Sequence, residues 1–224
     1  MRIGLFGGTF DPIHWGHLRS AEEVREALSL DRVLFIPTAR PPHKRSQTLT
    51  SASHRLAMVR RAVASNPGFS VSTVEISRPG LSYSIDTLRY FTNKSRGRDS
   101  YFFILGYDAF REIESWKDYQ EIFTLCHFVV TSRPGSGPGN LLGWLPVAVR
   151  MSFCYAAESK AYRHRSGTFL YFVRVTDIAV SASEIRRRSR EGRSIRYLVP
   201  LEVEAYIEKR GIYKAGREGR SRRR

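Results

Sequence analysis

Two patterns of apolar residues alternate along the chain. Short runs of adjacent apolar side chains predict strands that are buried on both faces. Between these runs, longer segments repeat an apolar residue every three or four positions, which is the spacing of a helix that packs on one side. Strands that alternate with helices in this way predict an α/β fold, a parallel sheet with helices on both faces.

The same patterns place the individual elements. Buried strands are expected at residues 3–6, 32–37, 101–105 and 126–131, with a half-exposed strand at 69–76 and an extended segment at 169–175. Helices are expected at residues 18–30, 51–65, 85–91, 183–190 and 200–209, with helical turns up to about residue 124. Residues 137–169 contain no motif that we can interpret.

Length and composition fit one globular domain. Of the 224 residues, 42% are hydrophobic, which is enough for a substantial core, and there is no internal repeat. We expect a single domain at residues 1–214 and a basic, disordered tail at residues 215–224. Two cysteines outside any motif, no signal peptide and no apolar run near the ~20 residues of a membrane span predict a cytoplasmic protein without a membrane partner.

The charge is the unusual part of the composition. Thirty-seven basic residues against 21 acidic ones give a net charge of +16, which suits a polyanionic partner such as ATP, nucleic acid or a membrane surface. Residues 186–224 hold 14 Lys/Arg and 5 Glu, so nine of the sixteen charges lie near the C-terminus. A nucleic-acid surface also needs aromatic side chains among the basic ones, whereas here the aromatics fall mainly in expected core strands. We therefore expect no nucleic acid.

Candidate chemistry is concentrated just after the first expected strand. Two glycines end that strand, and a short segment leads from them to His14 and His17. Glycines let the backbone approach a ligand closely, and free N–H groups at a helix start attract an anion. The two histidines are three residues apart, so they share one face of a first helical turn and can donate hydrogen bonds to a phosphate. The residues expected at this phosphate site are Gly7, Gly8, Thr9, Phe10, His14, Gly16 and His17.

Other well-known signatures are missing from the sequence. Neither G-x-x-x-x-G-K-[ST] nor G-x-G-x-x-G after a strand is present, so the common phosphate-binding loops are excluded. No Ser/His/Asp or Cys/His arrangement offers a protein nucleophile.

The segment G-G-T-F-D-P-I-H-W-G-H, residues 7–17, resembles the N-terminal motif of the (H/T)-x-G-H nucleotidyltransferases and is most similar to the nicotinate-nucleotide adenylyltransferase branch. The resemblance implies a Rossmann-like, doubly wound parallel sheet and adenylyl transfer from ATP to nicotinate mononucleotide. His14 and His17 would be catalytic, aligning the substrates and offsetting charge in the transition state. We expect no protein-bound metal; Mg²⁺ would arrive with ATP, because no acidic cluster could hold it.

Two further stretches resemble the acceptor site of this branch. P-P-H-K, residues 41–44, follows the second strand, where Lys44 offers a movable charge to a phosphate; the resemblance makes it a catalytic and acceptor-binding residue. S-Y-S-I-D-T-L, residues 82–88, is by itself a helix N-cap with an acidic first turn. The resemblance implies that backbone N–H groups around Tyr83 and Ser84 meet the nicotinate carboxylate.

A third stretch begins at Gly106, after the strand at residues 101–105. Asp108 then lies at the carboxyl end of the sheet, where a carboxylate can accept ribose hydroxyls. Trp116 on its own would be interpreted as a core residue. The resemblance instead makes it the ring that stacks on the nicotinate moiety, since an electron-poor pyridinium suits an indole face.

The last stretch, I-A-V-S-A-S-E-I-R-R-R at residues 178–188, has a serine before a helix and arginine in the first turn, which is another anion site. It resembles the C-terminal I-S-S-T-x-I-R of the superfamily, with Ala182 in place of the second serine. Contacts to the β- and γ-phosphates are expected from Ser181, Ser183 and Arg186, and Arg186 would also be catalytic. Gly106 and Arg133 complete the expected ATP-binding set.

The acceptor remains open at this point. Nicotinamide mononucleotide or pantetheine phosphate would keep the reaction, although the pantetheine enzymes lack P-P-H-K and the Gly-x-Asp…Trp element. The acid is expected over the amide because backbone N–H groups near residues 83–84 offer only donors. A nucleic-acid-binding protein is the alternative from another class, and it rests on charge alone.

Overall fold

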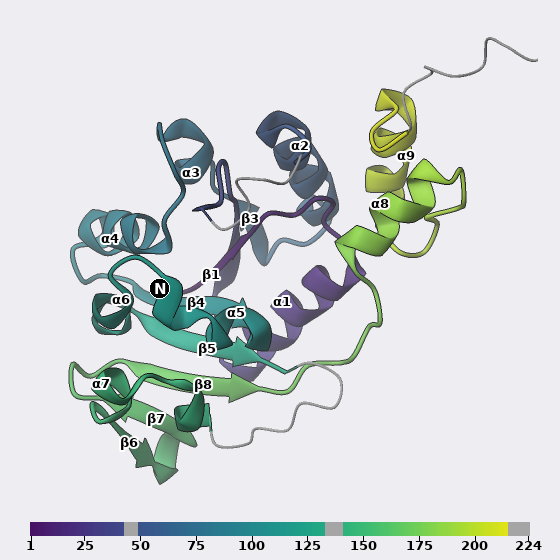
Figure 1. The fold of residues 1–224 in the computed structure, drawn as a ribbon. Coiled ribbons are helices and arrows are strands. Elements are labelled where there is room, and N and C mark those ends of the chain that lie inside the picture. Colours follow the sequence, from purple (N-terminus) through teal and green to yellow (C-terminus); the bar gives the residue numbers. More distant parts are fainter. Residues whose placement is uncertain (43–48, 133–140, 215–224) are drawn as a thin grey trace, which may run out of the picture.

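The computed structural model describes residues 1–42, 49–132 and 141–214. Within them, one eight-stranded sheet is covered by helices, as Figure 1 shows. The strands are β1 (Arg2–Gly8), β2 (Arg32–Pro37), β3 (Phe69–Val71), β4 (Ser100–Gly106), β5 (His127–Thr131), β6 (Phe153–Ala156), β7 (Ala161–His164) and β8 (Phe169–Val173). The helices are α1 (Trp15–Ala27), α2 (Ala52–Val63), α3 (Val74–Ser77), α4 (Ser84–Ser95), α5 (Tyr107–Arg111), α6 (Tyr119–Leu125), α7 (Val147–Arg150), α8 (Ala182–Arg190) and α9 (Leu201–Arg210).

The order of the strands places a ligand-binding edge next to β1. The sheet runs β3-β2-β1-β4-β5-β8-β7-β6, and every neighbouring pair from β3 to β8 is parallel. The chain moves outward from β1 through β2 to β3, and then crosses to β4 on the other side of β1. In doubly wound sheets, ligands bind at the carboxyl ends of the strands where this reversal occurs. The expected doubly wound α/β fold is confirmed.

Alternate residues of the central strands supply two separate cores. Phe102 and Ile104 of β4 face a core that includes residues of α1, α2, α8 and α9, whereas Phe103 and Leu105 face a core that includes residues of α4, α5, α6 and α7. Successive side chains of a strand point to opposite faces, so one continuous apolar run fills both layers. This arrangement explains why the central strands read as unbroken hydrophobic runs.

The three expected helices at residues 18–30, 51–65 and 85–91 are present, with differences at their ends. The first helix begins at Trp15, three residues earlier than expected, because His14 is its N-cap. α2 begins after Ser51, whose hydroxyl accepts a hydrogen bond from the His54 backbone at 3.4 Å. α4 is longer than expected at both ends.

The expected strand at residues 69–76 is wrong in its second half. β3 ends at Val71, and the short helix α3 occupies Val74–Ser77. The backbone turns into a helix there, with the Ser77 N–H donating to the Thr73 carbonyl oxygen, and Glu75, which the alternation placed on the exposed face, is buried. Its carboxyl group has a partner from α4, which local sequence does not reveal.

The sheet is also not parallel throughout. β6 pairs antiparallel with β7, and β7 pairs antiparallel with β8, so an antiparallel extension follows the parallel part. β6 and β7 lie in residues 137–169, the stretch without an interpretable motif. In Figure 1 the segment after β8 runs from this side of the sheet to α8, which brings the C-terminal helices back to the edge beside α1. No helix among the described residues is long and apolar enough to cross a bilayer.

Candidate functional site

The turn after β1 is built around glycine and a buried phenylalanine. A Cβ atom on Gly8 would lie 2.8 Å from Cζ of Phe10, so a side chain at this position would displace the ring. Phe10 has a positive φ of 49° and packs edge-on against Phe6 at 5.8 Å between ring centroids. Glycine therefore lets the chain turn tightly at the end of β1 while Phe10 anchors the turn in the core.

His14 and His17 lie together at the start of α1, as their spacing predicts. His14 is the N-cap residue, and its backbone N–H donates to Nδ1 of His17 at 3.3 Å. The two imidazole rings have centroids 3.7 Å apart and planes inclined by 30°. Because His17 accepts at Nδ1, a neutral His17 carries its proton on Nε2, which leaves that N–H as a donor.

Both imidazoles are neutral at pH 7 in the free protein. Burial lowers the pKa of His14 to about 4. Burial also lowers the pKa of His17, and the neighbouring His14 acts in the same direction. Nδ1 of His14 is buried and has no hydrogen-bond partner among the described residues. A buried polar atom without a partner is costly, so this nitrogen is one that a ligand can satisfy.

Gly16 allows the first turn of α1 to pack closely. A Cβ atom there would lie 3.1 Å from Nδ1 of His14 and 3.2 Å from Cγ1 of Val180. Because residue 16 has no side chain, the His14 ring and the segment at Val180 can both pack against the first turn of α1. This contact brings residues 178–181 to the phosphate turn, as expected for an ATP site built from both motifs.

The C-terminal motif meets the N-terminal one through Asp11. Nη1 of Arg186 donates to the Asp11 carbonyl oxygen at 2.7 Å, and the Tyr213 hydroxyl donates to Asp11 Oδ1 at 2.6 Å. Ser181 is the N-cap of α8, where its hydroxyl accepts from the Glu184 backbone at 3.3 Å. The helix thus begins at Ala182, one residue earlier than expected. Ser183 lies beside the cap, with its hydroxyl 3.1 Å from that of Ser181.

Arg55 is a structural element of the site that the sequence did not reveal. Its side chain is 1% exposed and donates to the carbonyl oxygens of Thr9, Thr38, Ala39 and Thr50 at 2.6 to 3.1 Å. Burial lowers the pKa of this guanidinium, while the charge of Asp11 acts to raise it. Arg55 therefore clamps the phosphate turn to the loop after β2. The helical spacing of α2 carries no signal for this role.

Tyr83 and Ser84 lie at the start of α4, the position expected for an acceptor-binding turn. Tyr83 is the N-cap and Ser84 the first helical residue, and neither makes a side-chain cap. Nζ of Lys117 lies 5.0 Å from the centroid of the Tyr83 ring and 3.4 Å from Asp86 Oδ1. These contacts bring the start of α4 close to the segment that follows Trp116.

Trp116 and Asp108 lie on the segment after β4. The Trp116 ring is half-buried and packs edge-on against Phe103 at 6.1 Å. Asp108 is exposed in the first turn of α5, after Gly106, which is the N-cap. Part of the Trp116 ring therefore contacts the core and part remains accessible, and its stacking on the nicotinate ring stays a prediction.

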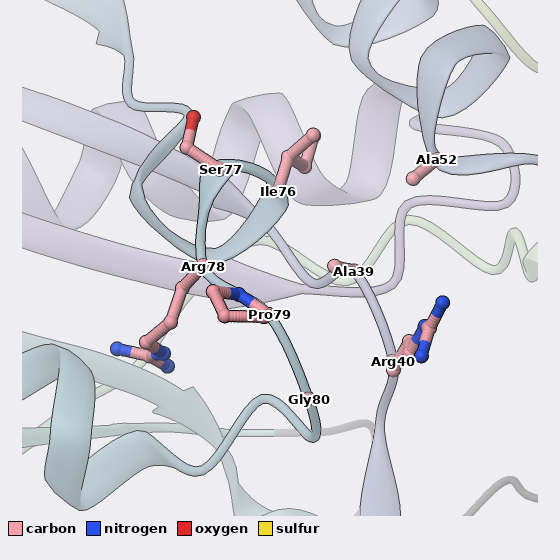
Figure 2. A pocket seen from close by; sticks show the side chains of 8 residues that line it. All are labelled: Ala39, Arg40, Ala52, Ile76, Ser77, Arg78, Pro79 and Gly80. Atoms are coloured by element: carbon pink, nitrogen blue, oxygen red, sulfur yellow. The ribbon is translucent and has the colours of Figure 1, made fainter.

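A cavity of about 510 Å³ opens between the loop after β2 and the loop that follows α3. Figure 2 shows that its two arginines, Arg40 and Arg78, point away from each other. The residues that line it are Ala39, Arg40, Ala52, Ile76, Ser77, Arg78, Pro79 and Gly80. None of the acceptor residues predicted within the described part of the chain belongs to this lining.

Two predicted site residues, Lys44 and Arg133, lie outside the described residues, as does the predicted tail at residues 215–224. No three His, Cys, Asp or Glu side chains converge as a metal site within the described ranges. Of the predicted ATP-binding residues that are described, those of the N-terminal motif and of α8 meet through Asp11, whereas Gly106 ends β4, the neighbour of β1.

Comparisons with known proteins identify the family of the chain. Residues 5–188 match the model of the cytidylyltransferase-like family. The probable nicotinate-nucleotide adenylyltransferase of Geobacter sulfurreducens is 49% identical over 213 residues, covering 95% of this chain and 98% of that protein. The corresponding protein of Geotalea daltonii is 50% identical over 217 residues, covering 97% of this chain and 100% of that protein.

Solved structures share the fold at lower sequence identity. Plasmodium falciparum nicotinic acid mononucleotide adenylyltransferase complexed with NaAD has a TM-score of 0.73 at 17% identity, covering 95% of this chain and 97% of that one. The same enzyme complexed with APC has a TM-score of 0.71, also at 17% identity, with coverage of 95% and 96%.

Proposed function

The chain belongs to the nicotinate-nucleotide adenylyltransferases of the cytidylyltransferase-like family, and we propose how the residues of its site perform the reaction of that family. The reaction transfers the adenylyl group of ATP to nicotinate mononucleotide, giving nicotinate adenine dinucleotide and pyrophosphate in NAD biosynthesis. The observation that carries the assignment of roles is the pair of buried His14 and half-buried His17 at the start of α1, a few residues after Asp11, whose carbonyl oxygen accepts from Arg186.

The chemical step needs no nucleophile from the protein. A phosphate oxygen of nicotinate mononucleotide forms a bond to the α-phosphorus of ATP. The bond from that phosphorus to the oxygen that bridges to the β-phosphate breaks, and pyrophosphate leaves with the electron pair. The protein must hold two anionic groups in line and stabilise the charge that accumulates between them.

The phosphate end provides hydrogen-bond donors for this charge. His17 would offer its Nε2–H. In the first turn of α1 the backbone N–H groups of Trp15 and His17 already donate to the carbonyl oxygens of Leu198 and His14, so the N–H of Gly16 is the backbone donor that would face the phosphates. Negative charge beside a buried imidazole favours its protonated form, so bound phosphates would raise the pKa values of His14 and His17. The N-terminus of α8, with Ser181, Ser183 and Arg186, would hold the β- and γ-phosphates. Gly106 and Arg133 would complete the ATP site.

Mg²⁺ fits this site as a component of the ATP substrate. The described residues offer no cluster of metal-ligating side chains, and a magnesium ion is commonly held by substrate phosphates with few protein ligands. The ion would supply positive charge to the triphosphate. The protein side chains then need only contact the phosphate oxygens.

The acceptor would be held by the segments around α4 and α5. Trp116 presents the accessible part of its indole ring to the nicotinate ring, and the Asp108 carboxylate accepts hydrogen bonds from ribose hydroxyls. Backbone N–H groups at Tyr83 and Ser84 would donate to the nicotinate carboxylate, because the first N–H groups of a helix have no partner within the helix. Lys44 would contact the acceptor phosphate.

The assignment is tested by measuring pyrophosphate release from purified protein with ATP and each acceptor in turn. We expect rapid release with nicotinate mononucleotide, slower release with nicotinamide mononucleotide and none with pantetheine phosphate. Omitting the acceptor is the control for ATP hydrolysis. Release that is fastest with pantetheine phosphate, or independent of any acceptor, would contradict the proposed function.

A further inference from the structure

Glu75 is a buried carboxyl group that the reaction described above does not use. It lies in α3 with 6% of its surface exposed. The Thr87 hydroxyl, from the first turns of α4, donates to its Oε1 at 2.8 Å. Its other oxygen, Oε2, is buried without a hydrogen-bond partner among the described residues. Glu75 therefore connects α3 to the helix whose start is the proposed carboxylate-binding turn.

An arginine continues this connection to the turn itself. Nη2 of Arg78 donates to the Thr87 hydroxyl at 3.1 Å and approaches the Tyr83 carbonyl oxygen at 3.5 Å. Arg78 also lines the cavity shown in Figure 2, where its side chain points away from Arg40. The Thr87 hydroxyl thus accepts a hydrogen bond from Arg78 and donates one to Glu75, which fixes its orientation.

The same carboxyl group faces the loop after β2. The hydroxyls of Thr38 and Ser82 act to lower the pKa of Glu75, so both lie beside its carboxyl group. Ser82 is in turn paired with Arg40: its backbone N–H donates to the Arg40 carbonyl oxygen at 3.0 Å, and its hydroxyl accepts from the Arg40 backbone at 3.2 Å. Glu75 therefore lies where the loop after β2 and the loop before α4 join.

Burying the carboxyl group of Glu75 costs free energy, and an apolar side chain could fill the same space without that cost. Desolvation raises the pKa of Glu75, which means that its charged form is disfavoured where it lies. A buried ionisable group is a weak source of stability, and an apolar side chain of similar volume often serves as well. The value of Glu75 therefore lies in the geometry that its polar contacts impose on the two loops.

We propose that Glu75 is a positioning residue for the acceptor, holding the carboxylate-binding turn at Tyr83–Ser84 in register with the loop after β2. This inference rests on the proposed function. Glu75 acts through Thr87 and Ser82 and does not itself touch the substrate. Its loss should loosen the fit of nicotinate mononucleotide and leave the ATP end, clamped by Arg55 and Asp11, as it is.

The test is the Glu75→Gln variant, which keeps the size of the side chain but places an amide NH₂, in place of a carboxylate oxygen, among the hydroxyls of Thr38 and Ser82. We expect KM for nicotinate mononucleotide to rise about tenfold, with kcat and KM for ATP within about threefold of the parent enzyme. The preference for the acid over the amide acceptor should fall by a similar factor. A folded variant whose acceptor KM stays within about twofold, or whose two KM values rise equally, would overturn the proposal.

Two further variants keep the test decisive. Thr87→Val removes the bridging hydroxyl without changing the shape of α4, so it should reproduce the rise in acceptor KM. Combined with Glu75→Gln, it should raise the acceptor KM little further, because both substitutions interrupt the same connection through Glu75 between α4 and the loop after β2. Thr87→Val also carries the test alone if Glu75→Gln does not fold. A Thr87→Val enzyme with an unchanged acceptor KM would contradict the proposal.

Glu204 provides the matched control. It is another glutamate that is 6% exposed, but it lies in α9 with Nε of Arg196 at 3.6 Å, away from the acceptor loops. Glu204→Gln should change only thermal stability, so its acceptor KM should equal that of the parent. Failure of the parent enzyme to make the dinucleotide would contradict the proposed function. An active parent with an unaltered Glu75→Gln variant would overturn the positioning role alone.

Discussion

The phosphate end and the acceptor end of the site are built in opposite ways. At the phosphate end, Phe10, Asp11 and His14 are buried, and Arg55 holds the surrounding backbone by four carbonyl oxygens. At the acceptor end, Asp108 is exposed and Trp116 is half-buried. Donors that must stabilise a transition state benefit from being fixed in advance, because no energy is then spent on reorganising them during the reaction.

The two ends differ in the structural elements that hold their residues in place. The phosphate end lies on core strands and the first turn of a helix, so packing fixes its geometry. The acceptor end lies on helix starts joined by side-chain contacts such as those of Lys117 and Arg78. We therefore expect changes at the phosphate end to lower kcat and changes at the acceptor end to alter KM and selectivity.

Replacing His17 should have the largest effect. The His17→Ala variant loses a donor that acts where charge develops, and loss of such a donor costs ~10²–10³ in kcat. Steady-state kinetics with thermal unfolding as the folding check measures this. His164→Ala, at a buried histidine in the distant strand β7, should leave kcat unchanged. A folded His17→Ala enzyme with near-parental turnover would remove the catalytic role assigned to the phosphate end.

Acidification should destabilise the phosphate end next most strongly. The pKa of His14 is about 4 in the folded protein and about 6.5 in the unfolded chain, so between these values only the unfolded chain binds the proton. The free energy of unfolding should therefore fall as pH drops from 6.5 to 4, by up to about 3 kcal/mol from His14. Urea unfolding of the parent and of His14→Gln measures this contribution.

His127 is the control for the pH experiment. Burial also lowers its pKa to about 4, but it stacks on Phe102 in the core of the sheet. His127→Gln should also reduce the slope of the free energy of unfolding against pH. When the unfolding is repeated with ATP present, only the contribution of His14 should change. Equal slopes for the parent and His14→Gln would show that His14 is not held in its neutral form by burial.

The acceptor end should discriminate by about 10- to 100-fold in kcat/KM between nicotinate and nicotinamide mononucleotides. Donor-only N–H groups near Tyr83 and Ser84 satisfy a carboxylate, whereas the amide NH₂ would face another donor and stay unpaired. A competition with both acceptors at equal concentration, followed by separation of the dinucleotides, measures the ratio. Equal amounts of product would mean that the pocket also contains an acceptor group.

Removal of residues 216–224 should have the smallest effect. The segment adds Arg217, Arg220 and the last three arginines against one glutamate, and it carries none of the site motifs. We expect kcat and both KM values to stay within about threefold, because added surface charge alone acts weakly at physiological salt. Loss of activity on truncation, measured in the same assay, would assign the tail to the site.

The phosphate end could be predicted from sequence because its determinants are local. Glycines, two histidines and a helix start lie within a few residues, so their spacing alone places them on one face. The alternation of buried strands and helices likewise predicted a parallel sheet covered by helices on both faces. Both predictions depend on periodicities of the backbone that hold regardless of distant contacts.

What sequence could not predict depends on partners far along the chain. Glu75 is buried with a hydrogen bond from Thr87, and Arg55 is buried with hydrogen bonds to carbonyl groups of the turn after β1 and of both ends of the connection between β2 and α2. Each looks like a surface residue in its own helix. The strands β6 and β7 were missed for a similar reason, since they are short and their side chains at Cys154 and Tyr155 are exposed.

The most direct test of the account follows the oxygen atoms of the acceptor. Nicotinate mononucleotide labelled with ¹⁸O in its phosphate is incubated with ATP and the enzyme, and the products are examined by mass spectrometry. If an oxygen of the acceptor phosphate becomes the bridge to the α-phosphorus, all of the label should appear in nicotinate adenine dinucleotide and none in pyrophosphate. Label in pyrophosphate, or unlabelled AMP as the main product, would contradict adenylyl transfer by this site.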